Sequence, residues 1–239
     1  MTDSTAVSVH HEGAELVGML AMPEAPGPHP GVLVMHSALG ISDSMRERAV
    51  TLARLGYAGL AVDMFGGGRN DAVTAQKAGP FDELIAAPEL LRARTVAWHQ
   101  ALVGTPGVDP ARTAAIGYCF GGQCVLELAR SGADLRVAVS FHGPLTTAAP
   151  AEPGRVRAHI AVYTGGKDPY VPREHVEALA QELKKAAVQH TLTVFSEAVH
   201  SFTDPNAASI RLPGIAYDPI ADAVSWAGTV ALLAELTAS

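Results

Sequence analysis

The fold of this chain is decided by residues 113–130, which read TAAIG (Thr113–Gly117), YC, and FGGQCVLELAR (Phe120–Arg130). The short apolar run at Thr113–Gly117 predicts a buried strand, and the segment Phe120–Arg130 predicts a helix. The hexapeptide GYCFGG at their junction has the form G-x-nucleophile-x-G, which is typical of a very tight strand-to-helix turn. We therefore expect Cys119 at a helix N-terminus, where the macrodipole favours a thiolate.

A second interpretation of this turn is purely structural. Free cysteine is often a small buried hydrophobe, and glycine-rich turns between a strand and a helix also occur without catalysis. The position of Cys119 between a clear strand and a clear helix favours the catalytic interpretation.

Apolar runs alternate with helical segments on both sides of this turn. Such alternation predicts a mostly parallel sheet with helices on both faces, and a Glu12-Gly13 turn near the start predicts an N-terminal antiparallel hairpin. We expect one α/β domain over residues 1–239. The predicted strands are Ala6–His11, Ala14–Ala21, residues 31–35, Ala58–Asp63, Thr113–Gly117, Arg136–Phe141, His159–Thr164 and Thr191–Phe195, and the predicted helices are Asp43–Leu55, a stretch within Pro88–Val103, Phe120–Arg130, Arg173–Ala187 and Pro219–Leu236.

Composition narrows the possible partners. The chain has 48% hydrophobic residues and a net charge of −7 without a basic stripe, so we expect a small-molecule ligand and no nucleic acid. No apolar run approaches the roughly 20 residues of a membrane span, and we expect a cytoplasmic monomer or small homo-oligomer. Cys119 and Cys124 would diverge on a helix, which disfavours a disulfide. The adjacent pair His10-His11 would point to opposite faces of a strand, so no metal site is expected.

Two further polar residues follow predicted strands. Asp168 lies in the turn TGGKDP after the strand His159–Thr164, and His200 lies in VHSF after the strand Thr191–Phe195. Taken alone, Asp168 is typical of a turn and His200 of a surface loop. Together with Cys119 they give the chain order nucleophile, acid, base, which the α/β-hydrolase fold imposes. We therefore predict a catalytic triad.

The same motifs give the chain a family resemblance. The segments GYCFGG, GGKDPYVP, VHSF, DMFGGG and YDPIADAVSWAG resemble the dienelactone hydrolase family over almost the whole length. The resemblance implies an α/β-hydrolase fold, a triad of Cys119, His200 and Asp168, no cofactor, and hydrolysis of an enol-lactone or a related ester.

Two positions depart from the family pattern. Ser37 stands where the family has a glutamate that keeps the thiol neutral until substrate arrives, and His36 precedes it. Asp204 stands where the family has an arginine that binds a substrate carboxylate, and an acid there would repel such a group. Without the glutamate, we expect Cys119 and His200 to rest as a thiolate–imidazolium pair.

The predicted reaction passes through a thioester acyl-enzyme on Cys119, with His200 moving the proton and Asp168 orienting the imidazole. The backbone N–H groups of Ala38 and Phe120 are expected to form the oxyanion hole. Candidate pocket residues are Ser37, His36, Tyr118, His142, Tyr170 and Phe202, although aromatic residues near strand ends are more often part of the core.

Other functions remain open at this point. The chain could be a thioester or other acyl hydrolase with a different substrate, or a ligand-binding or slow-turnover module that kept the hydrolase fold. A redox sensor using Cys119 is a third interpretation, which the expected orientation of Cys124 disfavours.

Overall fold

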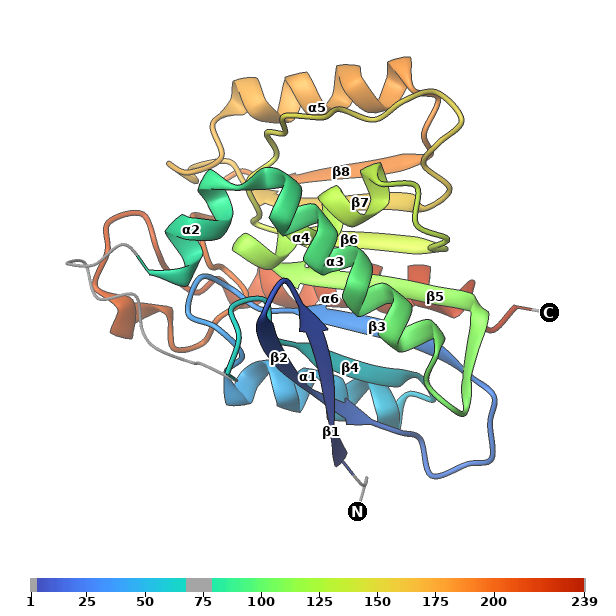
Figure 1. Cartoon of the computed structure of the whole chain (residues 1–239). Coiled ribbons are helices and arrows are strands. Elements are labelled where there is room, and N and C mark those ends of the chain that lie inside the picture. The colour runs from blue at the N-terminus through green and yellow to red at the C-terminus, as the bar shows by residue number, and fades with distance from the viewer. Residues whose placement is uncertain (1–3, 68–78, 239) are drawn as a thin grey trace.

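The computed structural model describes residues 4–67 and 79–238. Its centre is an eight-stranded sheet (Figure 1) whose strands lie in the order β1-β2-β4-β3-β5-β6-β7-β8. The strands are β1 (Ser4–His11), β2 (Ala14–Ala21), β3 (His29–Met35), β4 (Ala58–Val62), β5 (Val108–Tyr118), β6 (Val137–Phe141), β7 (His159–Gly165) and β8 (His190–Phe195).

The first two strands form the predicted antiparallel hairpin. Strand β1 pairs with β2 around a turn in which Glu12 and Gly13 both have positive φ, and β2 pairs antiparallel with β4. From β4 to β8 every neighbouring pair is parallel. The predicted mostly parallel sheet is confirmed, and its carboxyl ends meet at one edge, where ligands of such sheets bind.

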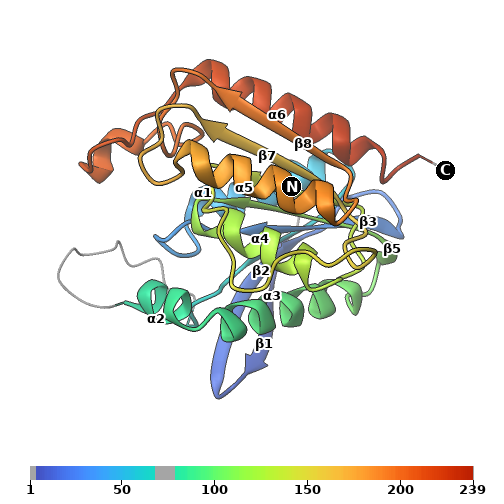
Figure 2. The same cartoon turned by 90° about the horizontal axis from the view of Figure 1, so that it is seen from above.

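Helices cover both faces of the sheet (Figures 1 and 2). One face packs against α1 and α6, and the other packs against α3, α4 and α5. The apolar runs of the central strands contribute side chains to both cores, because successive strand residues point to opposite faces. The helices are α1 (Asp43–Arg54), α2 (Pro80–Ala86), α3 (Pro88–Val103), α4 (Phe120–Arg130), α5 (Arg173–Lys185) and α6 (Pro219–Ala234).

Strand β5, helix α2 and a short 3-10 helix, η1 (Ala207–Ile210), differ from the sequence-based expectation. Strand β5 begins at Val108, earlier than the predicted Thr113, because Val108 and Asp109 pair with β3 before the register shifts between Pro30 and Gly31. Helix α2 was not predicted. Pro80 occupies its first turn, and the helix has only seven residues, so the apolar spacing of Phe81, Leu84 and Ile85 spans less than two turns and is too short to establish a helical period.

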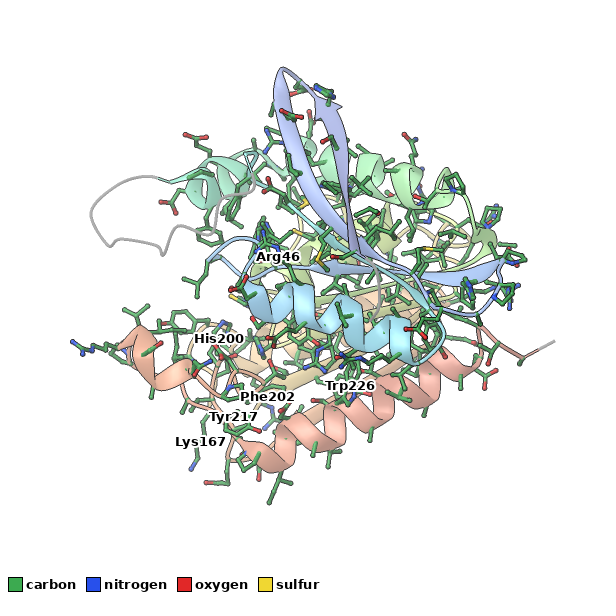
Figure 3. The ribbon with its side chains drawn as sticks, turned by 90° about the horizontal axis from the view of Figure 1, so that it is seen from below. Arg46, Lys167, His200, Phe202, Tyr217 and Trp226 are labelled. Atoms are coloured by element: carbon green, nitrogen blue, oxygen red, sulfur yellow. The ribbon has the colours of Figure 1, made fainter. Side chains whose placement is uncertain are left out.

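Charged side chains also tie the helices together. Arg130 of α4 donates to Glu127 at 3.0 Å and to Glu182 of α5 at 2.8 Å, and its side chain is almost fully buried. Arg48 of α1 lies over the ring of Trp226, 4.1 Å from the centroid, and Figure 3 shows Trp226 between α1 and α6.

No helix among residues 4–67 and 79–238 combines the length and the apolar character needed to cross a membrane.

Candidate active site

The turn between β5 and α4 holds Cys119 in an unusual backbone conformation. Its φ of 54° and ψ of −118° are costly for any residue that carries a Cβ. Neighbouring glycines make the turn possible: a Cβ on Gly121 would stand 2.2 Å from the carbonyl oxygen of Met35, and a Cβ on Gly117 would stand 2.0 Å from that of Gly121. The local sequence therefore presents the sulfur at the carboxyl edge of the sheet.

A continuous chain of polar atoms begins at this sulfur. His200 Nε2 lies 3.1 Å from Cys119 Sγ, and His200 Nδ1 lies 2.8 Å from Asp168 Oδ2. Asp168 follows β7, and His200 lies in the loop between β8 and α6, where Figure 3 also shows Phe202. His200 and Asp168 are buried, whereas Cys119 is partly exposed. The three side chains predicted as a triad are thus brought together, with the sulfur at the solvent end.

The acid and the imidazole are each held by backbone groups. Asp168 Oδ1 accepts a hydrogen bond from the N–H of Tyr170 at 2.8 Å. The N–H of His200 donates to the carbonyl of Gly214 at 3.0 Å, and its carbonyl accepts from the N–H of Ala216 at 3.1 Å. An ionised Asp168 can only accept, so Nδ1 carries a proton and Nε2 faces the sulfur.

The surroundings of His200 favour the charged imidazolium. Burial lowers the pKa of His200, but the hydrogen bonds to Asp168 and Cys119 and the charges of both groups act in the opposite direction and raise it to about 9. A histidine with such a pKa is protonated at pH 7. The site therefore places a positive charge 3.1 Å from the sulfur, and the resting ion pair of Cys119 and His200 stays a prediction.

Two backbone N–H groups that follow strands β3 and β5 are the predicted oxyanion donors. Ala38 follows β3, and Phe120 begins α4 directly after Cys119. Among the described residues neither N–H has a hydrogen-bond partner. These are the two groups predicted to form the oxyanion hole, and that role stays a prediction.

The six candidate pocket residues divide into two groups. Tyr170 is 46% exposed and its ring lies edge-on to that of His200, with 4.9 Å between centroids, while Ser37 is partly exposed. The other four side chains are buried, with exposures of 0 to 5%: His36, Tyr118, His142 and Phe202. Of these, His142 still touches the site, because its ring lies 5.1 Å from that of His200.

The remaining buried candidates pack into the core. Tyr118 points to the face covered by α1 and α6, where it stacks on Phe141 at 4.6 Å, and burial raises the pKa of Tyr118 to about 12. Phe202 is fully enclosed and contacts His142 and Phe195. Neither side chain has surface to offer a substrate.

Sequence reasoning missed a ring cluster around Phe120. Phe65 stacks on Phe120 at 5.5 Å, and Phe81 of α2 meets it edge-on at 5.4 Å. Phe65 comes just after β4, so the rule that ligands bind after the strands could have identified it. A cavity of about 550 Å³ lies beside Phe65, and no triad residue is among the described residues that line it.

The described part of the chain was predicted to hold no metal site. Within residues 4–67 and 79–238, no cluster of three histidine, cysteine or acidic side chains is arranged to hold a metal ion. The described site offers a sulfur, an imidazole, a carboxylate and two backbone donors. This is the equipment of nucleophilic acyl transfer.

Comparisons with known proteins agree with this chemistry. The sequence pattern of the dienelactone hydrolase family matches residues 16–237. A putative carboxymethylenebutenolidase of Synechocystis sp. is 27% identical over 215 residues, which cover 83% of this chain and 86% of that protein. A probable 2-oxo-3-(5-oxofuran-2-ylidene)propanoate lactonase of Bradyrhizobium sp. is 26% identical over 242 residues, with coverages of 95% and 92%.

A solved structure is similar over nearly the whole length. It is a dienelactone hydrolase-like promiscuous phosphotriesterase from metagenomic libraries, 37% identical to this chain, with a TM-score of 0.93 and 98% of each chain covered. The predicted family and fold are confirmed. The chain belongs to the dienelactone hydrolase family and is a carboxylic ester hydrolase with the α/β-hydrolase fold.

Proposed function

We propose that this protein hydrolyses a neutral carboxylic ester or lactone through a thioester formed on Cys119. One observation supports the proposal above all others. The sulfur stands at a strained turn, 3.1 Å from an imidazole whose other nitrogen is 2.8 Å from a buried carboxylate. This is the geometry of a nucleophile, a base and an orienting acid.

In the first half of the reaction the Cys119 thiolate attacks the substrate carbonyl. The negative charge moves from sulfur to the carbonyl oxygen, where the N–H groups of Ala38 and Phe120 would donate hydrogen bonds to it. Loss of the thiolate removes one of the groups that raise the pKa of His200. The imidazolium is then more acidic and protonates the departing alkoxide, which leaves the thioester.

In the second half the neutral His200 takes a proton from water, and the resulting hydroxide equivalent attacks the thioester carbonyl. Collapse of the tetrahedral intermediate expels the thiolate and restores the imidazolium beside it. Asp168 fixes the orientation of the ring throughout and balances its charge. In a lactone the alkoxide stays attached to the acyl group, so the product is a single ring-opened acid.

A neutral substrate follows from the charges near the site. Asp204 lies four residues beyond His200, and its Oδ1 accepts a hydrogen bond from the N–H of Asn206 at 2.8 Å, so the carboxylate belongs to an ordered turn. A substrate carboxylate approaching this turn would meet a charge of the same sign. We therefore propose that the ester or lactone is uncharged close to the scissile bond.

The test is turnover of a panel of p-nitrophenyl esters and enol-lactones by Cys119→Ala, with Cys124→Ala as the matched control. Cys119→Ala should lose nearly all turnover, whereas Cys124→Ala should keep it, because Cys124 is fully buried in α4. Intact-protein mass spectrometry during turnover should find an acyl adduct on Cys119. Wild-type activity in Cys119→Ala would overturn the nucleophile assignment.

The same mass measurement separates a catalyst from a ligand-binding or slow-turnover protein. An adduct on Cys119 that persists without product release would favour the latter. A reactive thiol at Cys119 is stable only in a reducing compartment, so we propose the cytoplasm as the location.

Phosphotriester hydrolysis is a second candidate activity. The solved relative that is 37% identical is described as a promiscuous phosphotriesterase. In this chain Cys119 is partly exposed and lies beside His200, whose pKa is raised to about 9. This arrangement would suit attack on a phosphoryl centre as well as on a carbonyl. A p-nitrophenyl phosphotriester tests the idea directly. Release of p-nitrophenol that requires Cys119 supports it, and its absence rejects it.

A further inference from the structure

His36 is a fully buried histidine that joins two loops at the carboxyl edge of the sheet. Its Nε2 lies 3.0 Å from the backbone nitrogen of Met64, in the loop after β4, and its Nδ1 lies 2.6 Å from the carbonyl oxygen of Ser37. A backbone N–H can only donate, so Nε2 must be unprotonated. Nδ1 therefore carries the proton and donates to Ser37, and the two contacts together define one neutral tautomer.

The environment of the ring keeps it in this neutral form. Burial lowers the pKa of His36, and the contact with the Ser37 carbonyl and the charge of Asp63 oppose the effect only in part. A second proton on Nε2 would face the N–H of Met64 and break that hydrogen bond. At neutral pH the ring thus acts as a fixed donor toward Ser37 and a fixed acceptor toward Met64.

Peptide geometry carries this arrangement to the reacting centre. The peptide between Ser37 and Ala38 is planar and trans, so its C=O and its N–H point in opposite directions. The Ser37 oxygen is anchored twice, by His36 Nδ1 at 2.6 Å and by the N–H of Gly40 at 3.1 Å. Anchoring the oxygen sets the direction of the Ala38 N–H, which has no partner in the described part of the chain.

We propose that His36 is a positioning residue that aims the Ala38 N–H at the oxyanion of the acyl-transfer intermediate. The inference rests on the proposed function, since it needs an oxyanion to form at Cys119. The ring also packs near the side chain of the residue that carries the second donor, because its centroid lies 6.0 Å from that of Phe120 and 4.6 Å from that of Phe65. The imidazole thereby joins the loop that carries the Ala38 N–H to the loop after β4.

The test uses His36→Leu, which fills similar space without either hydrogen bond, and compares oxygen esters with thionoesters of the same acyl group. Sulfur is a poor hydrogen-bond acceptor, so a thionoester gains little from an oxyanion hole. Removing one oxyanion donor typically lowers kcat about 100- to 1000-fold, and a misaimed donor should lower it at least about 10-fold. We expect this loss in kcat for the oxygen ester, with little change in KM and a much smaller loss for the thionoester.

The matched control is His99→Leu. His99 is also buried, burial lowers its pKa, and its Nε2 contacts Thr113 Oγ1 at 3.1 Å, in the middle of β5 and six residues before Cys119. Its replacement should cost comparable thermal stability and leave the ester-to-thionoester ratio unchanged. If His36→Leu lowers kcat for the oxygen ester and for the thionoester by the same factor, so that their ratio keeps the wild-type value, the positioning role is wrong.

Two smaller variants keep the test decisive if His36→Leu does not fold. His36→Asn places its amide near the former Nδ1 and can still donate to Ser37, whereas His36→Gln places its amide near the former Nε2 and can still accept from Met64. We expect the Asn variant to retain more kcat for the oxygen ester than the Gln variant, and the reverse order would overturn the proposal. Turnover by Cys119→Ala would instead reject the proposed function itself.

Discussion

Replacing Cys119 with alanine should change the titration of His200 by an amount that the structure allows us to work out. The pKa of His200 is about 9 against an ordinary value of 6.5, a difference of about 2.5 pH units. At 1.36 kcal/mol per unit this corresponds to about 3 kcal/mol in favour of the imidazolium. Burial opposes that preference, so Asp168 and Cys119 supply it together. Without the sulfur only Asp168 remains to act against burial.

The assay is a nuclear magnetic resonance titration of the imidazole of His200. In the wild-type protein a raised pKa favours the charged form, so the ring should stay protonated through pH 7 and lose its proton near pH 9. In Cys119→Ala we expect the midpoint at least about one pH unit lower. Cys124→Ala is the control, since it removes a buried thiol and leaves the pair intact.

Two results would refute this reasoning. The first is a wild-type midpoint near 6.5, which would mean that no thiolate stands beside the ring. The second is an equal midpoint in the wild-type protein and in Cys119→Ala, which would mean that Asp168 alone sets the pKa of His200. The signal of His142 can be recognised in the same spectra, because burial and the neighbouring His200 lower its pKa well below the ordinary value.

Three further predictions concern the turn between β5 and α4, the charge of the substrate, and the buried ion pair of Arg130. Gly121→Ala should lower the free energy of unfolding by more than about 2 kcal/mol in a denaturant titration, because the added Cβ would stand 2.2 Å from a carbonyl oxygen. Gly104→Ala is the control and should lower it much less. Equal losses in the two variants would contradict the steric argument. Asp204→Asn should lower KM about 2- to 5-fold for an ester that carries a carboxylate and leave KM for its neutral analogue unchanged. An equal change in KM for the two esters would exclude a charge effect. Glu182→Ala should cost about 3 kcal/mol of unfolding free energy, since it removes a partner of the buried Arg130 at 2.8 Å, and a loss under about 1 kcal/mol would show that Arg130 is satisfied without it.

Much of the fold could be predicted because this sheet is buried on both faces. Strands such as Ala58–Val62 are continuous apolar runs, and the helices between them are bounded by recognisable residues such as Pro88 and Pro219. Helix α2 was not predicted because its seven residues make less than two turns, which is too short for the spacing of its apolar residues to be recognised as helical. The spacing of apolar residues along the sequence thus predicts the long elements that pack against the sheet, and it does not predict a helix as short as α2.

The arrangement of the site was less accessible to sequence reasoning than the identity of its residues. The turn chemistry around Cys119 and the positions of Asp168 and His200 after strands predicted three side chains that the structure brings together. Adjacent residues in an extended strand point to opposite faces, however, so Tyr118 joins the core under α1 and α6 although it precedes the nucleophile. The contacts of His36 with Met64 join residues 28 positions apart, and no local pattern encodes such a pairing.

The strained backbone at position 119 has a consequence for how such enzymes can diverge. Its conformation is imposed by the close approach of Gly117 and Gly121 to neighbouring chain, not by anything the nucleophilic side chain itself binds. We therefore expect this turn to accept a side chain with either sulfur or oxygen at position 119 without a change in the surrounding backbone. A Cys119→Ser exchange should therefore leave the turn intact, and its consequences should fall on His200, which we propose moves the proton.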